Sequence, residues 1–231
     1  MTRAVLTFVL VGLMGAEPMP KKSAREALKP LHDLIGEWKG MGGPKHGSRD
    51  EREKGSWQEK IVWQWQFKGA DAWLRADLSK GKHYSRLEIR PKGEGYELSA
   101  TTLDKKTEAW PGKRDGTRLV FERKAEGEKR VERLVFSLLH SNRYLYRLES
   151  RAADSTVFAT KYEVGATKQG VPFAVVGKGP ECIVSGGLGT MTVSHKGKSY
   201  YVCCSGCRDA FAAEPEKYIK EYEENLKKAK E

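Results

Sequence analysis

Apolar and polar residues alternate along most of the middle of the chain, and a period of two is typical of β-strands that bury one face. The alternating segments are 61–67, 74–78, 96–100, 119–121, 134–138, 144–148 and 158–162. Turn-forming residues, glycine and asparagine among them, separate several of these segments, at 68–71, 80–81, 92–95, 115–116 and 141–142. This pattern of about eight to ten strands predicts an antiparallel sandwich or a closed barrel.

A short helix is expected before the first of these strands. Ser23 and Glu26 have the spacing of an N-terminal capping box, and leucines at 28, 31 and 34 recur at helical intervals. We expect Pro30 to interrupt or kink this helix, because proline lacks the amide hydrogen that a helix interior requires.

A Gly-x-Trp-x-Gly-x-Gly pattern, formed by Gly36, Trp38, Gly40 and Gly42, follows the helix directly. It resembles the first strand of the lipocalin-like (calycin) barrels, most closely their nitrobindin-like branch, and the resemblance covers residues 31–165. The resemblance implies a barrel, rather than a sandwich, in which the tryptophan closes one end. The glycines would let the strand bend sharply.

That resemblance also implies a barrel cavity for an apolar ligand, or for haem in the nitrobindin-like branch. Haem requires an axial donor such as histidine. The histidines of this segment lie outside the last strand, where the family's ligand would sit, so we do not expect haem. They are His32, His46, His83 and His140. The spacing of residues supports no catalytic constellation, and we therefore expect a ligand-binding or scaffolding barrel rather than an enzyme.

A second, smaller α+β unit is expected after a glycine-containing linker. The expected boundaries are 23–165 for the barrel domain, 166–178 for the linker and 179–231 for the C-terminal domain. The C-terminal domain is predicted to contain a hairpin that turns at 195–198, a helix that opens at Cys207 and a second helix that starts near Pro215.

All four cysteines of the chain lie in this unit. Cys182 is followed by twenty residues, then Cys203, three residues and Cys207, with Cys204 as an extra thiol. The start of a helix lowers the pKa of a thiol, so the last three cysteines are expected to favour the thiolate. Three or four soft ligands at one point suit a Zn²⁺ or Cu⁺ ion. Cys204 is a candidate additional ligand, and so is His195 in the predicted turn.

The segment 197–219 reads GKSYYVCCSGCRDAFAAEPEKYI and resembles YHS domains, which overlap the TRASH class of metal-binding modules. Its cysteine spacing, aromatic residues and Pro-x-x-Tyr turn carry the resemblance. The resemblance implies that Cys182, Cys203 and Cys207 bind a metal ion, and that the module serves in heavy-metal sensing, handling or trafficking. The family has serine at the position of Cys204, so the resemblance leaves the role of that residue open.

Two other uses of the cysteines stay open. Four cysteines can form two disulfides in three pairings, and a bond between adjacent Cys203 and Cys204 would be strained, which favours Cys182 as a partner of one of the others. The barrel would then be a carrier of an apolar small molecule. Cys204 and Cys207 also form a Cys-x-x-Cys, which is typical of thiol–disulfide oxidoreductases, although no thioredoxin-like βαβ pattern surrounds it.

The first sixteen residues have the features of a secretory signal peptide. A charged start at Arg3 is followed by an apolar run at 4–15 and by small residues that end at Ala16. We expect an exported, periplasmic or secreted protein with no stable membrane insertion after removal of residues 1–16, an uncleaved anchor being the alternative. Export permits disulfides as well as metal sites.

The formal net charge of +11 changes this picture little. Residues 171–231 carry nine basic and eight acidic groups, so the excess lies in the strand-rich region, where basic residues are interleaved with glutamate. Scattered charge is typical of a solvated surface, and we expect no nucleic-acid partner. The hydrophobic content of 39% and the four cysteines exclude a disordered chain and a disulfide-stapled toxin.

The sequence therefore predicts a mainly β protein: a lipocalin-like antiparallel β-barrel followed by a small α+β YHS-type module. We expect an exported metal-binding protein that holds Zn or Cu through cysteines. The sequence identifies no protein partner.

Overall fold

The computed structural model describes residues 22–124, 129–170 and 179–228. The predicted signal peptide, 1–16, and residues 171–178 of the predicted linker lie outside the described residues, so both remain predictions. Within the described part of the chain, no helix combines the length and the apolar character needed to cross a membrane.

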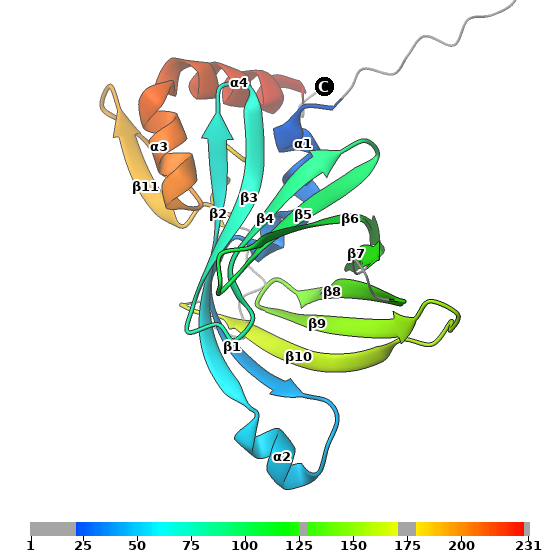
Figure 1. The fold of residues 1–231 in the computed structure, drawn as a ribbon. Helices are drawn as coiled ribbons and strands as arrows, with labels where there is room; N and C mark the ends of the chain where they lie inside the picture. The colour runs from blue at the N-terminus through cyan, green and yellow to red at the C-terminus, as the bar shows by residue number, and fades with distance from the viewer. Residues whose placement is uncertain (1–21, 125–128, 171–178, 229–231) are drawn as a thin grey trace, which may run out of the picture.

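Ten antiparallel strands of the described chain close into one barrel (Figure 1). The sheet closes because β1 pairs with β2 on one side and with β10 on the other. The strands are β1 (Gly36–Pro44), β2 (Trp57–Lys68), β3 (Asp71–Ser79), β4 (Tyr84–Lys92), β5 (Gly95–Thr102), β6 (Thr107–Asp115), β7 (Arg118–Lys124), β8 (Arg130–His140), β9 (Arg143–Ala152) and β10 (Ala159–Lys168). The prediction of a mainly β antiparallel barrel is confirmed.

The C-terminal module, which is residues 179–228 here, contains a two-stranded hairpin and two helices. Its elements are β11 (Met191–His195), β12 (Lys198–Val202), α3 (Ser205–Ala213) and α4 (Pro215–Lys228). The hairpin turns at Lys196 and Gly197, which both have positive φ. The helix expected to open at Cys207 begins two residues earlier, so Cys207 lies within its first turn.

Three elements of the barrel domain are not expected from the sequence pattern. β4 contains a register shift between Tyr84 and Arg86, which interrupts its alternation. β6 buries only Trp110. The short helix α2 (Arg49–Lys54) buries no residue and is held by a capping box with Ser48. Each lacks the regular apolar period on which the prediction depended.

The end of the barrel domain also differs from the expected boundary. β10 continues to Lys168, three residues into the segment predicted as a linker, and these residues pair with the start of β1. The register places Lys168 opposite Trp38. Pairing along a neighbouring strand, rather than the residue types of 166–168, extends the barrel here.

The N-terminal helix α1 (Ala24–Leu28) and the 3₁₀ helix η1 (Lys29–Leu34) form an apolar plug beside the barrel core. Leu28, Leu31 and Leu34 are completely buried, and Pro30 lies where the α-helix has ended, as the sequence predicts. The Trp38 indole nitrogen donates a hydrogen bond to the Leu34 carbonyl oxygen at 2.7 Å. Trp38 therefore fixes the plug to the first strand.

The glycines of the first strand make room for two side chains of β2. A Cβ atom at Gly42 would lie 2.2 Å from the Trp57 ring, and one at Gly40 would lie 2.8 Å from the Cγ atom of Glu59. The Glu59 carboxylate is buried and accepts hydrogen bonds from the Trp57 indole nitrogen at 2.9 Å and from the Tyr146 hydroxyl. These glycines thus permit close packing of β1 on β2.

Large aromatic side chains fill the barrel interior. The most deeply buried are Trp38, Trp63, Trp65, Trp110, Phe121, Phe136, Tyr144 and Tyr146. The exposed fraction is 0% for five of these side chains, which are Trp63, Trp65, Trp110, Phe121 and Phe136. No space as large as a water molecule therefore adjoins these five rings, and this part of the barrel is a packed core.

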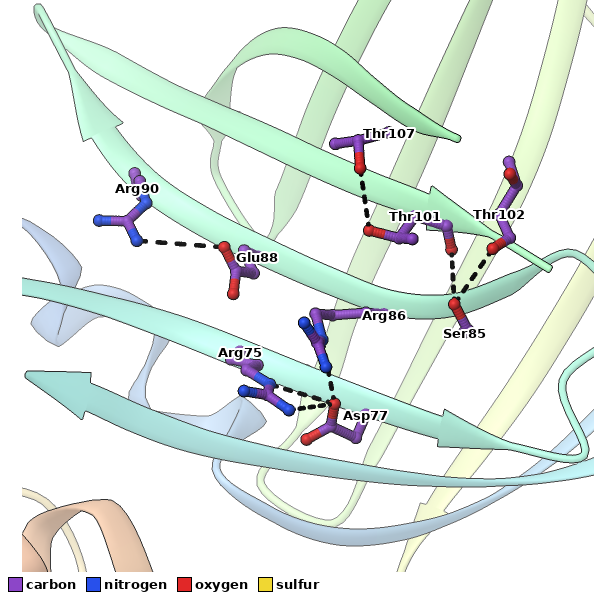
Figure 2. A network of polar contacts seen from close by, with 9 residues as sticks. All are labelled: Arg75, Asp77, Ser85, Arg86, Glu88, Arg90, Thr101, Thr102 and Thr107. Carbon is purple, nitrogen blue, oxygen red and sulfur yellow. Dashed lines mark hydrogen bonds and ion pairs between the residues drawn. The ribbon is translucent and has the colours of Figure 1, made fainter. Parts of the chain in front are cut away.

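The outer face of β3, β4 and β5 carries charged and hydroxyl side chains that pair across strands (Figure 2). Asp77 accepts hydrogen bonds from Arg75 at 2.8 Å and from Arg86 at 3.3 Å. The Ser85 hydroxyl lies near the Thr101 and Thr102 carbonyl oxygens. Arginines on this face have carboxylate partners, as expected of a solvated surface.

Candidate metal centre

Three buried thiols meet in the C-terminal module. The sulfur atoms of Cys182, Cys203 and Cys207 all lie within 4.8 Å of one another. The Cys203 and Cys207 sulfurs are 3.5 Å apart. A tetrahedral zinc ion with Zn–S bonds of about 2.3 Å separates its sulfurs by about 3.8 Å, whereas a disulfide joins them at about 2.0 Å. The three thiols are free, and their separation suits one ion.

Each of the three thiols comes from a different local structure. Cys182 begins a tight loop, residues 182–187, that is closed by a hydrogen bond from its own amide to the Gly187 carbonyl at 2.6 Å. The loop is tied to the hairpin by a bridge between Cys182 and Tyr201. Cys203 directly follows β12, and Cys207 lies in the first turn of α3. A loop, the end of the hairpin and the start of a helix thus bring the three thiols together.

Cys204, the fourth thiol, faces the barrel. Its sulfur lies 3.9 Å from that of Cys203 and accepts a hydrogen bond from the Trp65 amide at 3.4 Å. It does not belong to the group of three sulfurs that lie mutually within 4.8 Å. Cys204 thus contacts β2, and its sulfur lies beside the group of three thiols without belonging to it.

The structure does not bring His195 to the thiols. Its Nε2 atom lies 3.0 Å from a carboxylate oxygen of Glu216, at the exposed side of the module. The edge of its ring packs against Phe211. The hairpin turn that carries His195 points it at α4, because β11 and β12 place their turn one strand length away from Cys203. The prediction that His195 is an additional ligand therefore does not agree with its position in the structure.

The hydrogen bonds among the thiols shift their pKa values in opposite directions. Interaction with the neighbouring thiols lowers the pKa of Cys182 and of Cys204, whereas interaction with the Cys182 thiol raises the pKa of Cys203. Burial raises the pKa of Cys207. Hydrogen bonds among the thiols therefore bind their protons jointly, and at Cys207 burial opposes the effect of the helix start.

The C-terminal module packs closely on the barrel beside this site (Figure 1). A Cβ atom at Gly206 would lie 1.7 Å from the Trp65 carbonyl oxygen, so only glycine permits the contact of α3 with β2. The Ser205 hydroxyl donates to the Gln64 side chain at 3.0 Å. On the other side, Arg25 of α1 bonds the Val184 carbonyl at 3.1 Å. Residues of β2 and α1 thus contact the two segments of the module that carry Cys207 and Cys182.

Two barrel residues near the thiols escape sequence reasoning. The Lys168 ammonium donates to the Asp33 carbonyl at 3.2 Å. Burial lowers the pKa of Lys168, and Asp33 and then Cys203 oppose this shift. His32, on η1, packs against the loop 182–187 at Gly187. The sequence offers His32 only as a barrel histidine. Gly187 is the one sequence feature related to this contact, and the tertiary structure is needed to see why glycine is required there.

No protein-family model matches the chain, and no curated protein matches it significantly.

Proposed function

We propose that this chain is an exported metal-binding protein that holds one soft metal ion, Zn²⁺ or Cu⁺, through Cys182, Cys203 and Cys207. The observation that carries the proposal is the meeting of three buried sulfurs within 4.8 Å of one another. Thiolates are preferred ligands of both ions, and a group of three buried thiols is the arrangement such ions use.

The resemblance of residues 197–219 to YHS and TRASH modules supports the same proposal, since it implies the same three ligands. Metal handling or trafficking is the role that this resemblance implies. Export to the periplasm or beyond rests on the predicted signal peptide, 1–16, and belongs to the proposal.

Burial of the thiols favours metal binding over thiol–disulfide exchange. An exchanging thiol must be reached by a disulfide of another molecule. Cys204 is 6% exposed and Cys207 is 0% exposed, so neither residue of the Cys-x-x-Cys offers a sulfur to such a partner. A metal ion, in contrast, needs only a path for its entry.

The packed barrel interior favours a scaffolding role over transport of an apolar molecule. The rings of Trp63, Trp110 and Phe136 are completely buried by neighbouring side chains, so an apolar ligand would have to displace them. We propose that the barrel supports the metal site, which lies against β2 and the η1 plug.

The test is metal analysis of freshly purified, reduced protein, combined with a count of free thiols. We expect about one Zn or Cu ion per chain, with three thiolate ligands. Cys182→Ser should lose the ion. Cys204→Ser is the matched control, because it removes a neighbouring thiol outside the group of three, and it should keep the ion. Two disulfides and no metal would contradict the proposal.

A further inference from the structure

The imidazole of His32 reaches from the barrel plug to the loop that carries Cys182. A Cβ atom at Gly187 would lie 1.4 Å from the Nε2 atom of His32, so the ring occupies the space that a side chain at 187 would need. Gly187 closes the loop that begins at Cys182, because its carbonyl accepts the Cys182 amide hydrogen. The ring therefore lies against the loop that carries one of the three thiols.

One nitrogen of this ring has no partner. The Nδ1 atom of His32 is buried and makes no hydrogen bond within the described residues. A buried polar atom without a hydrogen bond costs about 1–3 kcal/mol, and such atoms in folded proteins call for an explanation. Burial lowers the pKa of His32, and the thiol of Cys182 is the largest influence that opposes this shift. The ring lies against the loop of Cys182, and burial favours its neutral form, which is the form that binds metals.

Three thiolates leave one position open around a tetrahedral ion. Three side chains are candidates for it. Besides His32 these are Cys204, which faces β2, and His195, which faces α4, and neither belongs to the group of three thiols. Cys204 accepts the Trp65 amide hydrogen, and His195 pairs with Glu216. His32 is the candidate with a nitrogen that lacks a partner.

We propose that His32 supplies the fourth ligand of the metal ion held by Cys182, Cys203 and Cys207. This inference rests on the proposed metal-binding function and adds that the barrel domain contributes to the coordination. No nitrogen of the ring lies within 4.8 Å of all three sulfurs, so binding draws the imidazole toward the ion. The ion then links η1 of the barrel plug directly to the C-terminal module.

The test is X-ray absorption spectroscopy of the full chain loaded with Zn²⁺, which counts sulfur and nitrogen neighbours of the ion. We expect about three sulfurs and one imidazole nitrogen in the wild type. His32→Gln should lose the imidazole signal and weaken zinc binding by about tenfold or more. Gly187→Ala should do the same, because its side chain displaces the ring without removing it. His195→Ala is the matched control and should keep both the imidazole signal and the affinity.

Several results would overturn the assignment while leaving the metal site in place. These are four sulfurs in the wild type with one lost in Cys204→Ser, three sulfurs with a water oxygen, and an imidazole signal that persists in His32→Gln. Circular dichroism shows whether each variant is folded, and Gly187→Ala provides the test if His32→Gln is not. A wild-type protein that binds no zinc at all overturns the proposed function together with this assignment.

Discussion

Gly206 is the position where a single added methyl group should separate the module from the barrel. A Cβ atom there would lie 1.7 Å from the Trp65 carbonyl oxygen and 2.8 Å from the Trp65 carbonyl carbon. Both atoms belong to the backbone of β2, so no side-chain rotation can relieve the clash. Gly206→Ala must therefore move α3 away from β2.

The size of the effect follows from these distances. Heavy atoms in ordinary contact are about 3.5 Å apart, so the first turn of α3 has to move by well over 1 Å. Forced overpacking of this kind costs about 1–3 kcal/mol, against a gain of up to about 1 kcal/mol that alanine normally has over glycine within a helix. The movement breaks the 3.4 Å contact between Cys204 and the Trp65 amide. It also uncovers Cys207, which is now completely buried.

The assay is the rate at which a neutral thiol reagent modifies the reduced, metal-free protein. If modification requires the module to open, a loss of about 1–3 kcal/mol of docking free energy raises the rate by about 5–150-fold. Gly165→Ala is the matched control, because its Cβ atom would lie 3.5 Å from the Leu145 side chain, an ordinary contact. Equal rates in Gly206→Ala and Gly165→Ala would refute the close packing of α3 on β2.

Three further predictions concern the plug, the barrel interior and the metal. Trp38→Phe removes the donor to the Leu34 carbonyl, and urea unfolding should show a loss of about 1–3 kcal/mol, whereas an unchanged stability would contradict this bond. Burial raises the pKa of Tyr84 to about 12, so protonated Tyr84 stabilises the fold fully below about pH 10, and this contribution is lost as pH rises through about 12. Tyr84→Phe should therefore lessen the alkaline loss of stability, and an identical pH profile would argue against the burial. Free Zn²⁺ at 100 times its Kd should raise the unfolding free energy by about 2.7 kcal/mol over chelated protein, and Cys182→Ser should abolish this difference.

The barrel could be predicted because most of its strands show the period-two burial pattern within their own sequences. In β2, Ile61, Trp63 and Trp65 are buried, whereas the residues that alternate with them, Val62, Gln64 and Gln66, are partly exposed. β6 buries only Trp110 and includes Pro111, so its sequence has no strand period. It is a strand because β5 and β7 pair with it on both sides. Such strands depend on their neighbours, and single-segment patterns cannot reveal them.

The candidate site could be predicted only as far as local spacing determines it. Cys203 and Cys207 are four positions apart around a helix start, and the hairpin returns the chain to the loop of Cys182. The surroundings of the thiols come from far along the chain. Cys204 contacts Trp65 across 139 positions, and His32 meets Gly187 from the plug. Contacts of this kind arise from tertiary packing, so no local sequence pattern predicts them.

The contact between α3 and β2 also explains why the barrel and the C-terminal module share one core, although the sequence pattern presents them as two domains. β1 pairs with β2 no further than Trp63, which leaves the Trp65 amide without a strand partner on that edge. Cys204, the N-cap residue of α3, makes no side-chain bond to its own helix and accepts this amide hydrogen instead. An unpaired buried amide would cost about 1–3 kcal/mol, and an open strand edge invites pairing with other chains. The apolar cluster runs without a break from Leu34 through Trp65 to Phe211. Separation of the domains would therefore expose a strand edge and split a continuous core, which makes the module part of the barrel's own stability.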